Sequence, residues 1–322
     1  MRKLSRILSA AEAPLLVAGD RKGPHDYPLP GAELLTLQKQ LELPLRLPQL
    51  LPVNHYVRKN IAYLVAISRR PSAIYETDDD NAPAPRWGVR SLNPSAIRVK
   101  KPGWHNVYRH FGKTLLWPRG FPLEQIAASE RSPAPKGADV KVYSPIQQGL
   151  ADGNPDVDAI WRLTLSTDVR FAARNSLALQ PRVWCPFNSQ STWWWPEVFP
   201  LLYLPSYCTF RMTDIWRSFV AQRCLWELGG VVTFHAPEVI QDRNVHNLLR
   251  DFQDEVPGYL QNAKICDTLA SLNLKAGPDS VADNLASCYE ALVVAGVFPR
   301  KEMRLLQAWL ADLKKITAGH VL

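Results

Sequence analysis

Apolar and polar positions along the first eighty residues follow two different periods, which predict helices and strands in alternation. Leu4, Ile7 and Leu8 fall on one face of a helix, and Tyr63 and Ile67 do the same in a later segment. The runs between these segments are too short for helices and end near Gly, Asp or Pro, as strands do. The predicted elements are helices at 2–12 and 54–68, strands at 15–18 and 73–78, and a segment at 32–41 that fits either type.

Beyond residue 81 the pattern is weak at first and then strongly helical. Residues 82–190 are rich in Pro, Trp and Asn, so we expect irregular structure there, with an exposed loop at 127–138. Thr213 is suited to cap a helix that Gly229 and Gly230 end. The predicted elements of this part are helices at 213–228, 247–272, 279–295 and 299–316 and a strand at 231–234.

This order of elements predicts an α/β fold whose ligand site lies where the strands end. Asp20 follows the first predicted strand, and three consecutive aspartates, Asp78, Asp79 and Asp80, follow the second. Clustered carboxylates repel one another unless a cation or solvent offsets their charge. Such oxygen ligands suit a hard divalent ion such as Mg²⁺ or Mn²⁺. An acidic triplet is also typical of a solvated turn, so its context decides between the two interpretations.

Composition narrows the class of protein. A chain of 322 residues with 46% hydrophobic content can bury a large core, as one large domain with an appendage or as two domains. The formal net charge of +8 favours an anionic partner, but the basic residues are dispersed, which argues against nucleic acid. Five widely spaced cysteines without a CxxC pair indicate reduced thiols rather than a zinc site or a disulfide framework.

The sequence predicts no transmembrane helix. The most apolar stretch, 193–210, is interrupted by Pro196, Pro200 and Pro205. Near the N-terminus, Glu12 interrupts a segment that would otherwise imitate a signal peptide. We therefore expect a cytoplasmic protein with no membrane-spanning segment. Peripheral contact with a membrane is compatible with this expectation.

A basic helix start precedes the acidic triplet. Arg58 and Lys59 stand in the first turns of the helix predicted at 54–68, where a helix N-terminus and their charges can meet a pyrophosphate. A solvated helix start would have the same composition. The sequence of basic helix, strand and acidic triplet nevertheless follows the order found in GT-A glycosyltransferases.

Several longer segments carry a closer resemblance. They are GDRKGP (19–24), LLPVNHYVRKNIAYLVAI (50–67), IYETDDDN (74–81), HFGKTLLWPRGFPLE (110–124), QQGLADGNPDVDAIWRLT (147–164), PFNSQSTWW (186–194) and FRMTDIWRSFVAQRCLWELGG (210–230). Over about residues 14–260 the chain resembles the STELLO family of glycosyltransferases, which has a GT-A-like catalytic region and was first known from plant Golgi membranes. The resemblance implies a soluble, single-module relative without the plant proteins' membrane anchor and additional regions.

The resemblance also implies a site for a nucleotide-sugar donor, with UDP as the expected nucleotide. Asp78 and Asp80 would hold Mn²⁺ or Mg²⁺ against the diphosphate, with His246 as a third ligand. Imidazole suits Mn²⁺ better than Mg²⁺, although a lone loop histidine is commonly a surface residue. The residues expected to contact the donor are Asp20, Arg58, Lys59, Asn60, Asp78 and Arg243.

The same resemblance implies which residues act in catalysis and which bind the acceptor. Asp214 opens a helix where inverting GT-A enzymes carry the carboxylate that takes the acceptor's proton, but an aspartate is also an ordinary helix-start residue. Asp156 and Asp158 are candidates for binding acceptor hydroxyls, in a segment that also suits a simple turn. Trp193 is a candidate for stacking on a sugar, although one or two of the three tryptophans at 193–195 belong in a core.

These expectations define two competing functions. The first is a metal-dependent, inverting glycosyltransferase with a GT-A-like domain at 1–250, a mixed central sheet and a helical C-terminal extension at 251–322. The alternative is a non-catalytic GT-A-like scaffold in polysaccharide or envelope assembly. The resemblance leads one to expect a strand ahead of the first helix, which this sequence does not include. Either the sequence begins late, or the nucleotide pocket is incomplete.

Overall fold

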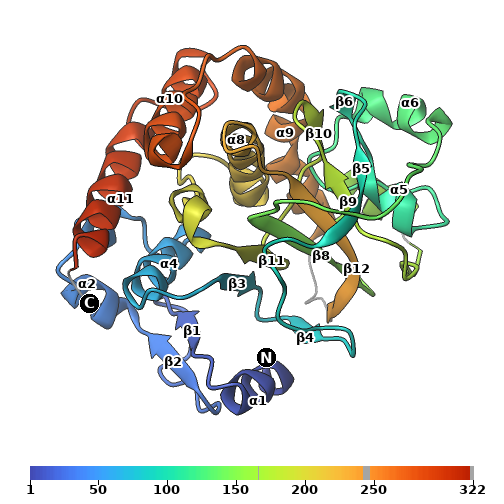
Figure 1. The fold of residues 1–322 in the computed structure, drawn as a ribbon. Helices are drawn as coiled ribbons and strands as arrows, with labels where there is room; N and C mark the ends of the chain where they lie inside the picture. The colour runs from blue at the N-terminus through green and yellow to red at the C-terminus, as the bar shows by residue number, and fades with distance from the viewer. Residues whose placement is uncertain (166, 242–246, 320–322) are drawn as a thin grey trace.

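A mixed sheet forms the centre of the molecule in the computed structural model, which describes residues 1–165, 167–241 and 247–319 (Figure 1). The strands of this sheet, in spatial order, are β3 (Ile74–Thr77), β11 (Ser191–Trp194), β8 (Ile146–Asp152), β12 (Val232–Gln241), β9 (Leu177–Leu179), β5 (Ser95–Val99) and β7 (Val140–Lys141), with β4 (Asn81–Pro83) paired to β12 beside this path. Two small parallel pairs lie outside it: β1 (Leu15–Ala18) with β2 (Ala32–Leu35), and β6 (Gly103–Trp104) with β10 (Val183–Trp184).

Strand direction determines where polar residues can gather. Strand β11 runs antiparallel to both β3 and β8, and β8 runs parallel to β12, so β3, β8 and β12 share one direction. Their last residues, Thr77, Asp152 and Gln241, therefore lie at the same edge of the sheet, which we call the carboxyl edge. The start of β11 reaches this edge too, because Ser191 pairs with Thr77.

Helices lie on several sides of this sheet. In Figure 1, α8 lies beside the sheet with α9 and α10 packed against α8, whereas α4 and α11 are drawn at the left and α5 and α6 at the right. The helices are α1 (Arg2–Ala10), α2 (Leu37–Glu42), α3 (Leu47–Leu50), α4 (Lys59–Ser68), α5 (Val107–Phe111), α6 (Ile126–Arg131), α7 (Ala159–Thr164), α8 (Thr213–Trp226), α9 (Leu248–Ala270), α10 (Val281–Val294) and α11 (Glu302–Thr317). Single 3₁₀ segments are η1 (Tyr56–Arg58), η2 (Leu123–Gln125), η3 (Pro196–Leu202), η4 (Phe210–Met212) and η5 (Pro278–Ser280).

The predicted class, α/β with a mixed central sheet, is confirmed. The long helices agree with their predicted positions, and the ambiguous segment 32–41 holds a strand followed by the start of a helix, β2 and α2. The expectation of irregular structure over 82–190 is wrong, because central strands of the sheet lie there. Those strands are short and buried on both faces, and Gln147 and Gln148 are buried within β8. A strand of that kind lacks the alternation that marks a half-buried one. The loop expected at 127–138 begins within α6.

The C-terminal helices are joined to the rest of the molecule by buried carboxylates. Glu302, at the start of α11, accepts backbone N–H bonds from Ser206 and Tyr207. Asp312, further along α11, accepts the backbone N–H groups of Arg46 and Leu47, which satisfies the otherwise unpaired start of α3. Helices α9, α10 and α11 also contribute to the same hydrophobic core as the sheet. The boundary at residue 250 stays a prediction.

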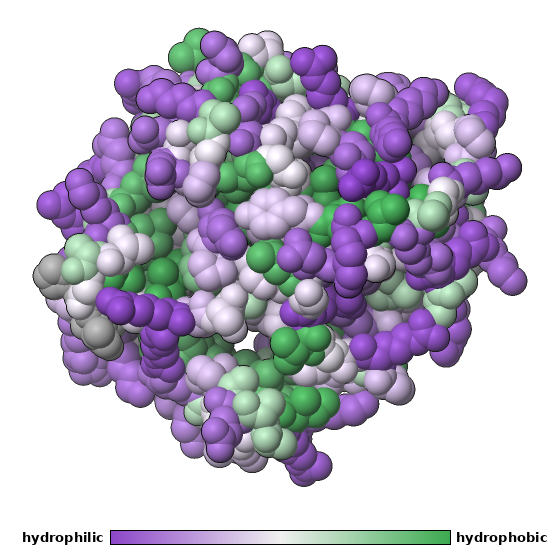
Figure 2. All heavy atoms as spheres, in the orientation of Figure 1, coloured by the Kyte–Doolittle hydropathy of each residue, from purple (hydrophilic) through white to green (hydrophobic). Residues whose placement is uncertain are grey.

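The surface is largely hydrophilic on the face drawn in Figure 2, where hydrophobic residues show mainly in recesses toward the middle. Among residues 1–165, 167–241 and 247–319, none of the helices combines the length and the apolar character needed to cross a bilayer.

Candidate functional site

The acidic triplet lies at the carboxyl edge, as the sequence predicts. Strand β3 ends at Thr77, and Asp78, Asp79 and Asp80 form the turn that leads into β4. Asp79 is exposed, whereas Oδ2 of Asp80 accepts a hydrogen bond of 2.9 Å from the side-chain amide of Gln241, at the end of β12. The turn is thus held against two strands of the edge.

Asp78 faces several other ionisable groups. Its Oδ1 lies 3.2 Å from Nζ of Lys59, and 31% of its side chain is exposed. Burial raises the pKa of Asp78 to about 6, Lys59 opposes this shift, and the carboxylates of Asp214 and Asp80 add to it. Asp78 therefore carries negative charge that its surroundings only partly offset, and Asp214 is close enough to affect it.

Lys59 brings a positive charge to this edge. Besides Asp78, its ammonium donates to the carbonyl oxygen of Thr77 at 3.2 Å and lies 3.9 Å from Glu76. Burial would lower the pKa of Lys59, but Tyr63 and the carboxylates of Asp78 and Glu76 raise it above its usual range. The side chain is charged at neutral pH, and the acidic groups around it favour that charge.

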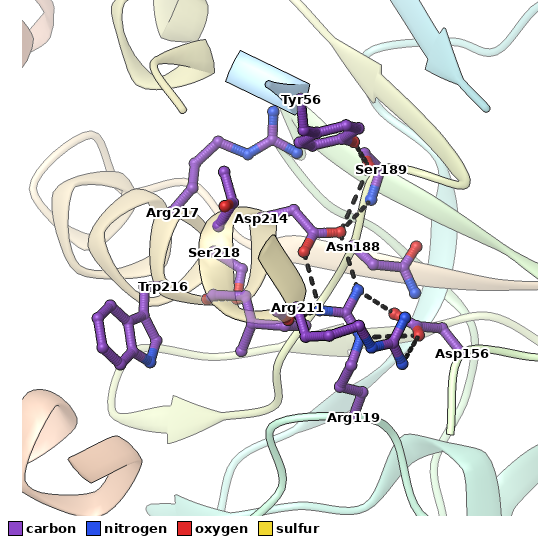
Figure 3. Close-up of polar contacts among 12 residues, drawn as sticks. Tyr56, Arg119, Asp156, Asn188, Ser189, Arg211, Asp214, Trp216, Arg217 and Ser218 are labelled. Atoms are coloured by element: carbon purple, nitrogen blue, oxygen red, sulfur yellow. Dashed lines mark hydrogen bonds and ion pairs between the residues drawn. The ribbon is translucent and has the colours of Figure 1, made fainter. Parts of the chain in front are cut away.

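Asp214 is held by an arginine that it shares with Asp156 (Figure 3). Arg119 binds Asp156 through Nε at 2.8 Å and Asp214 through both terminal nitrogens, at 3.0 and 3.1 Å. Asp214 stands in the first turn of α8, as predicted. Its Oδ2 also accepts hydrogen bonds from the backbone N–H and the hydroxyl of Ser189, at 3.2 and 3.3 Å.

Ser189 connects Asp214 to the triplet. Its hydroxyl is hydrogen-bonded to the hydroxyl of Tyr56, as Figure 3 shows, and Lys59 lies 3.4 Å from that same tyrosine oxygen. Burial raises the pKa of Tyr56 well above its usual value, and the carboxylates of Asp78 and Asp214 act in the same direction. We call these five residues, Tyr56, Lys59, Asp78, Ser189 and Asp214, the edge site.

The two acceptor candidates on 156–158 are both buried. Against burial, Arg119 and Arg211 hold the pKa of Asp156 well below its usual range. Asp158 caps α7 by accepting the backbone N–H of Trp161 at 2.8 Å, and it also accepts the indole N–H of Trp117 at 2.6 Å. Burial raises the pKa of Asp158 to about 7. Both carboxylates are engaged by protein groups.

Three of the predicted donor-binding residues have structural partners. Arg58 is 2% exposed, and its guanidinium donates to the side chain of Gln40 and to backbone carbonyl oxygens. Asn60 exchanges two hydrogen bonds of 2.9 Å with the backbone of Leu204. Asp20 accepts the backbone N–H of His55 at 2.9 Å, which orders the segment leading into η1. These contacts position the edge site, and only Asp20 is partly exposed.

Trp193 lies in an aromatic cluster instead of lining an open surface. Its ring centroid is 4.9 Å from that of Tyr75 and 6.0 Å from that of Trp87. All three tryptophans of 193–195 are buried, whereas the sequence assigned only one or two of them to a core. Phe210 is exposed and packs edge-on against Tyr56 of the edge site, with ring centroids 5.4 Å apart.

The predicted metal ligands that the structure describes are Asp78 and Asp80. Both belong to one turn, where Asp78 pairs with Lys59 and Asp80 accepts from Gln241, and carboxylate oxygens are ligands that hard divalent cations prefer. The described residues, with gaps at 166, 242–246 and 320–322, contain no cluster of three or more His, Cys, Asp or Glu suited to a metal. The predicted third ligand, His246, and the predicted phosphate contact, Arg243, lie outside the described residues.

Sequence reasoning missed three residues of this region: Tyr56, Arg119 and Ser189. Arg119 and Ser189 stand in the segments WPRGFP and PFNSQS, both of which carry the family resemblance, and neither has a local pattern that assigns it a role. Ser189 and Tyr56 are 133 positions apart in the chain, so only the folded structure reveals their contact.

Comparison with known proteins gives a consistent result. The family described as STELLO glycosyltransferases matches residues 211–320. Probable glycosyltransferase STELLO1 of Arabidopsis thaliana is 28% identical over 335 residues, which cover 95% of this chain and 41% of that protein. Probable glycosyltransferase STELLO2 of the same plant is 28% identical over 328 residues, with 93% and 41% covered. The chain thus spans about two fifths of the length of these curated relatives.

Proposed function

We propose, on the premise that the chain belongs to the STELLO family of glycosyltransferases, that it transfers a sugar from a nucleotide donor to an acceptor hydroxyl at the edge site. The observation that carries this proposal is the chain of contacts that links the two carboxylates: Asp214 is bonded to Ser189, Ser189 to Tyr56, and Lys59 lies 3.4 Å from the Tyr56 hydroxyl and 3.2 Å from Asp78. Strand ends of an open α/β sheet are where such folds bind nucleotides.

The donor diphosphate is assigned to the acidic turn. Asp78 and Asp80 would hold a Mn²⁺ or Mg²⁺ ion, which supplies positive charge to the diphosphate as it leaves. Lys59 lies beside Asp78 and contributes a second positive charge. A uridine diphosphate sugar is the expected donor.

Asp214 is the residue that we assign to accept the proton of the acceptor hydroxyl. In an inverting transfer the acceptor oxygen bonds to the anomeric carbon as the bond from that carbon to the diphosphate breaks, and the hydroxyl proton passes to a carboxylate. Of the hydrogen bonds that Asp214 accepts, the one from the Ser189 hydroxyl is the longest, at 3.3 Å. An acceptor hydroxyl can replace that bond while Arg119 keeps the carboxylate in place.

Donor binding and donor hydrolysis test the proposal. We expect UDP to raise the melting temperature of the full chain only when Mn²⁺ or Mg²⁺ is present, because ligands that bind the native state stabilise it by mass action. A screen of nucleotide sugars with Mn²⁺ should then find one donor that is hydrolysed. If no nucleotide stabilises the chain and no donor turns over, the proposal is wrong.

The non-catalytic scaffold has one observation in its favour. Asp156, Asp158, Arg58 and Asn60 are all engaged by protein groups, so the described part of the site offers fewer free polar groups than its sequence suggests. Metal-dependent UDP binding separates the two functions, since a scaffold has no requirement for it.

A further inference from the structure

A cavity separate from the edge site lies among α5, α6 and β6, which Figure 1 draws at the right of the molecule. Its volume is about 400 Å³, and it shares no residue with the edge site. That size is within the range of pockets that hold small molecules. Nothing in the proposed sugar transfer uses it.

Positive side chains dominate the wall of this cavity. Arg109, Lys113 and Arg174 line it, against a single acidic residue, Glu130. Arg109 lies 3.5 Å from Glu130 and also donates to the carbonyl oxygen of Ser132, so its guanidinium is held in place. Lys113 and Arg174 are exposed and form no ion pair with any acidic residue in the described part of the chain.

Two histidines on the same wall lie near these cations. Burial, with additional contributions from His110 and Arg109, lowers the pKa of His105 to about 4. Burial also lowers the pKa of His110, which Arg174 reinforces and a hydrogen bond to Asn175 opposes. Neighbouring cations disfavour the protonated, positively charged form of a histidine, and the same cations attract an anion.

The histidines also supply unused hydrogen-bonding atoms. His110 is 8% exposed, and its Nε2 lies 2.9 Å from the carbonyl oxygen of Asn175, so Nε2 carries the hydrogen. Its Nδ1 and Nε2 of His105 have no partner among the described residues. Buried polar atoms without partners are costly, and a ligand with hydroxyl groups would satisfy an accepting ring nitrogen.

We propose that this cavity binds a small phosphate ester, with the phosphate between Arg109, Lys113 and Arg174 and the remainder of the molecule against Trp104 and His110. Guanidinium groups match phosphate oxygens in pairs, and an ammonium adds a point charge. Trp104 lines the cavity and offers the apolar surface on which a sugar ring packs. A soluble sugar phosphate and a lipid phosphate present the same chemistry to these residues.

Calorimetric titration of the full chain with glucose 1-phosphate, with glucose as the uncharged comparison, tests the proposal. The informative variant is Lys113→Ala combined with Arg174→Ala, because both side chains are exposed and the fold does not depend on them. Its matched control is Arg98→Ala combined with Lys100→Ala, which removes the same two charges from exposed positions outside the cavity. We expect the cavity variant to weaken binding about tenfold or more, and the control about twofold or less.

A second arm identifies the source of the phosphate. Co-sedimentation with phosphatidylcholine vesicles, with and without phosphatidic acid, measures binding to a lipid phosphate. In both experiments, loss of binding in the cavity variant but not in the control supports the site. If only glucose 1-phosphate binds, the ligand is a soluble phosphate ester, and if only the phosphatidic acid vesicles bind, it is a lipid phosphate. Equal loss in both variants, or no binding of either probe to the unaltered chain, overturns the proposal.

Discussion

Two acid–arginine clusters contact the same helix, α8, and they differ in how completely they are closed. Arg217 pairs with Glu76 of β3 at 2.6 Å, and both side chains are 1% exposed. The same oxygen, Oε1, accepts the indole N–H of Trp194, and Oε2 accepts the hydroxyl of Tyr63 and lies 3.9 Å from Lys59, so the unit joins β3 to α8. The cluster of Asp214 has similar charges and is buried less completely, since 8% of the Asp214 side chain is exposed, and it is linked through Ser189 and Tyr56 to the region of the partly exposed Asp78.

Closure, rather than the presence of charge, therefore distinguishes a structural ion pair from a candidate site. A buried ion pair that cannot be reached from solvent cannot contact a substrate, whichever residues form it. Both clusters would look alike in a search for buried carboxylates. The predictions below test whether Glu76 acts on stability and Asp214 on activity.

Glu76→Gln should have the largest effect on stability. It leaves the Arg217 charge buried without its carboxylate, and breaking a buried pair in this way costs about 3–5 kcal/mol. The free energy of unfolding, from urea denaturation, measures the loss. The control is Glu33→Gln, whose 2.6 Å pair with Arg69 is exposed and should cost about 1 kcal/mol or less. Similar losses for the two variants would remove the structural role given to Glu76.

Asp214→Asn should have the largest effect on activity. Turnover should fall about 10²-fold or more, the usual scale for loss of a general base. Stability should fall less than in Glu76→Gln, because Asp156 still holds Arg119.

Asp156→Asn is the matched control, since it removes the other carboxylate from the same arginine. If both variants lose the same turnover, Asp214 acts only by positioning Arg119. If Asp214→Asn keeps full turnover, another group accepts the proton.

Asp80→Asn should affect ligand binding more than stability. Removing one carboxylate lowers the charge and the number of oxygen ligands at the turn, so we expect Mn²⁺-dependent stabilisation by UDP to weaken about tenfold in apparent affinity. Thermal melts at several UDP concentrations measure the change. Asp79→Asn removes the same charge from the exposed member of the turn and should have a smaller effect. Normal binding of UDP with Mn²⁺ by Asp80→Asn would exclude the metal assignment.

The sequence predicts the local part of this site and misses the part built from distant segments. The acidic turn and the helix that begins at Asp214 are visible because strand and helix periods are local properties. The contacts of Asp214 with Arg119 and of Ser189 with Tyr56 join residues 95 and 133 positions apart. No periodicity encodes such pairs. The central strands were missed for a related reason, since burial on both faces removes their alternation.

Burial also explains why several predicted ligand residues have structural partners instead. Arg58 and Asn60 stand at the start of a helix, where composition alone suggests phosphate binding. In the structure they lie beneath the surface and bind Gln40 and Leu204. The resemblance pointed to residues that the structure brings together at the carboxyl edge, but it does not distinguish residues that face a ligand from those that support them.

The smallest predicted effect concerns a buried polar group that carries no charge. His235 in β12 lies 2.7 Å from the hydroxyl of Ser176 and 2.9 Å from the side-chain carbonyl of Gln147, and burial, reinforced by Arg90, lowers its pKa well below the usual value. The folded state therefore binds fewer protons than the unfolded state below about pH 6.5. Stability contributed by this group is complete above that pH and decreases as the pH falls.

At pH 5.5 the loss from His235 should be about 1.4 kcal/mol, because one pH unit below an unfolded pKa near 6.5 corresponds to that energy. His235→Gln keeps polar atoms at the position but has no proton to gain, so its free energy of unfolding should fall less between pH 7 and pH 5.5. Urea denaturation at both pH values measures the difference. If the free energy of unfolding falls equally in the two proteins between pH 7 and pH 5.5, His235 is already protonated in the folded state. The sheet would then hold a third buried charge in addition to the two clusters on α8.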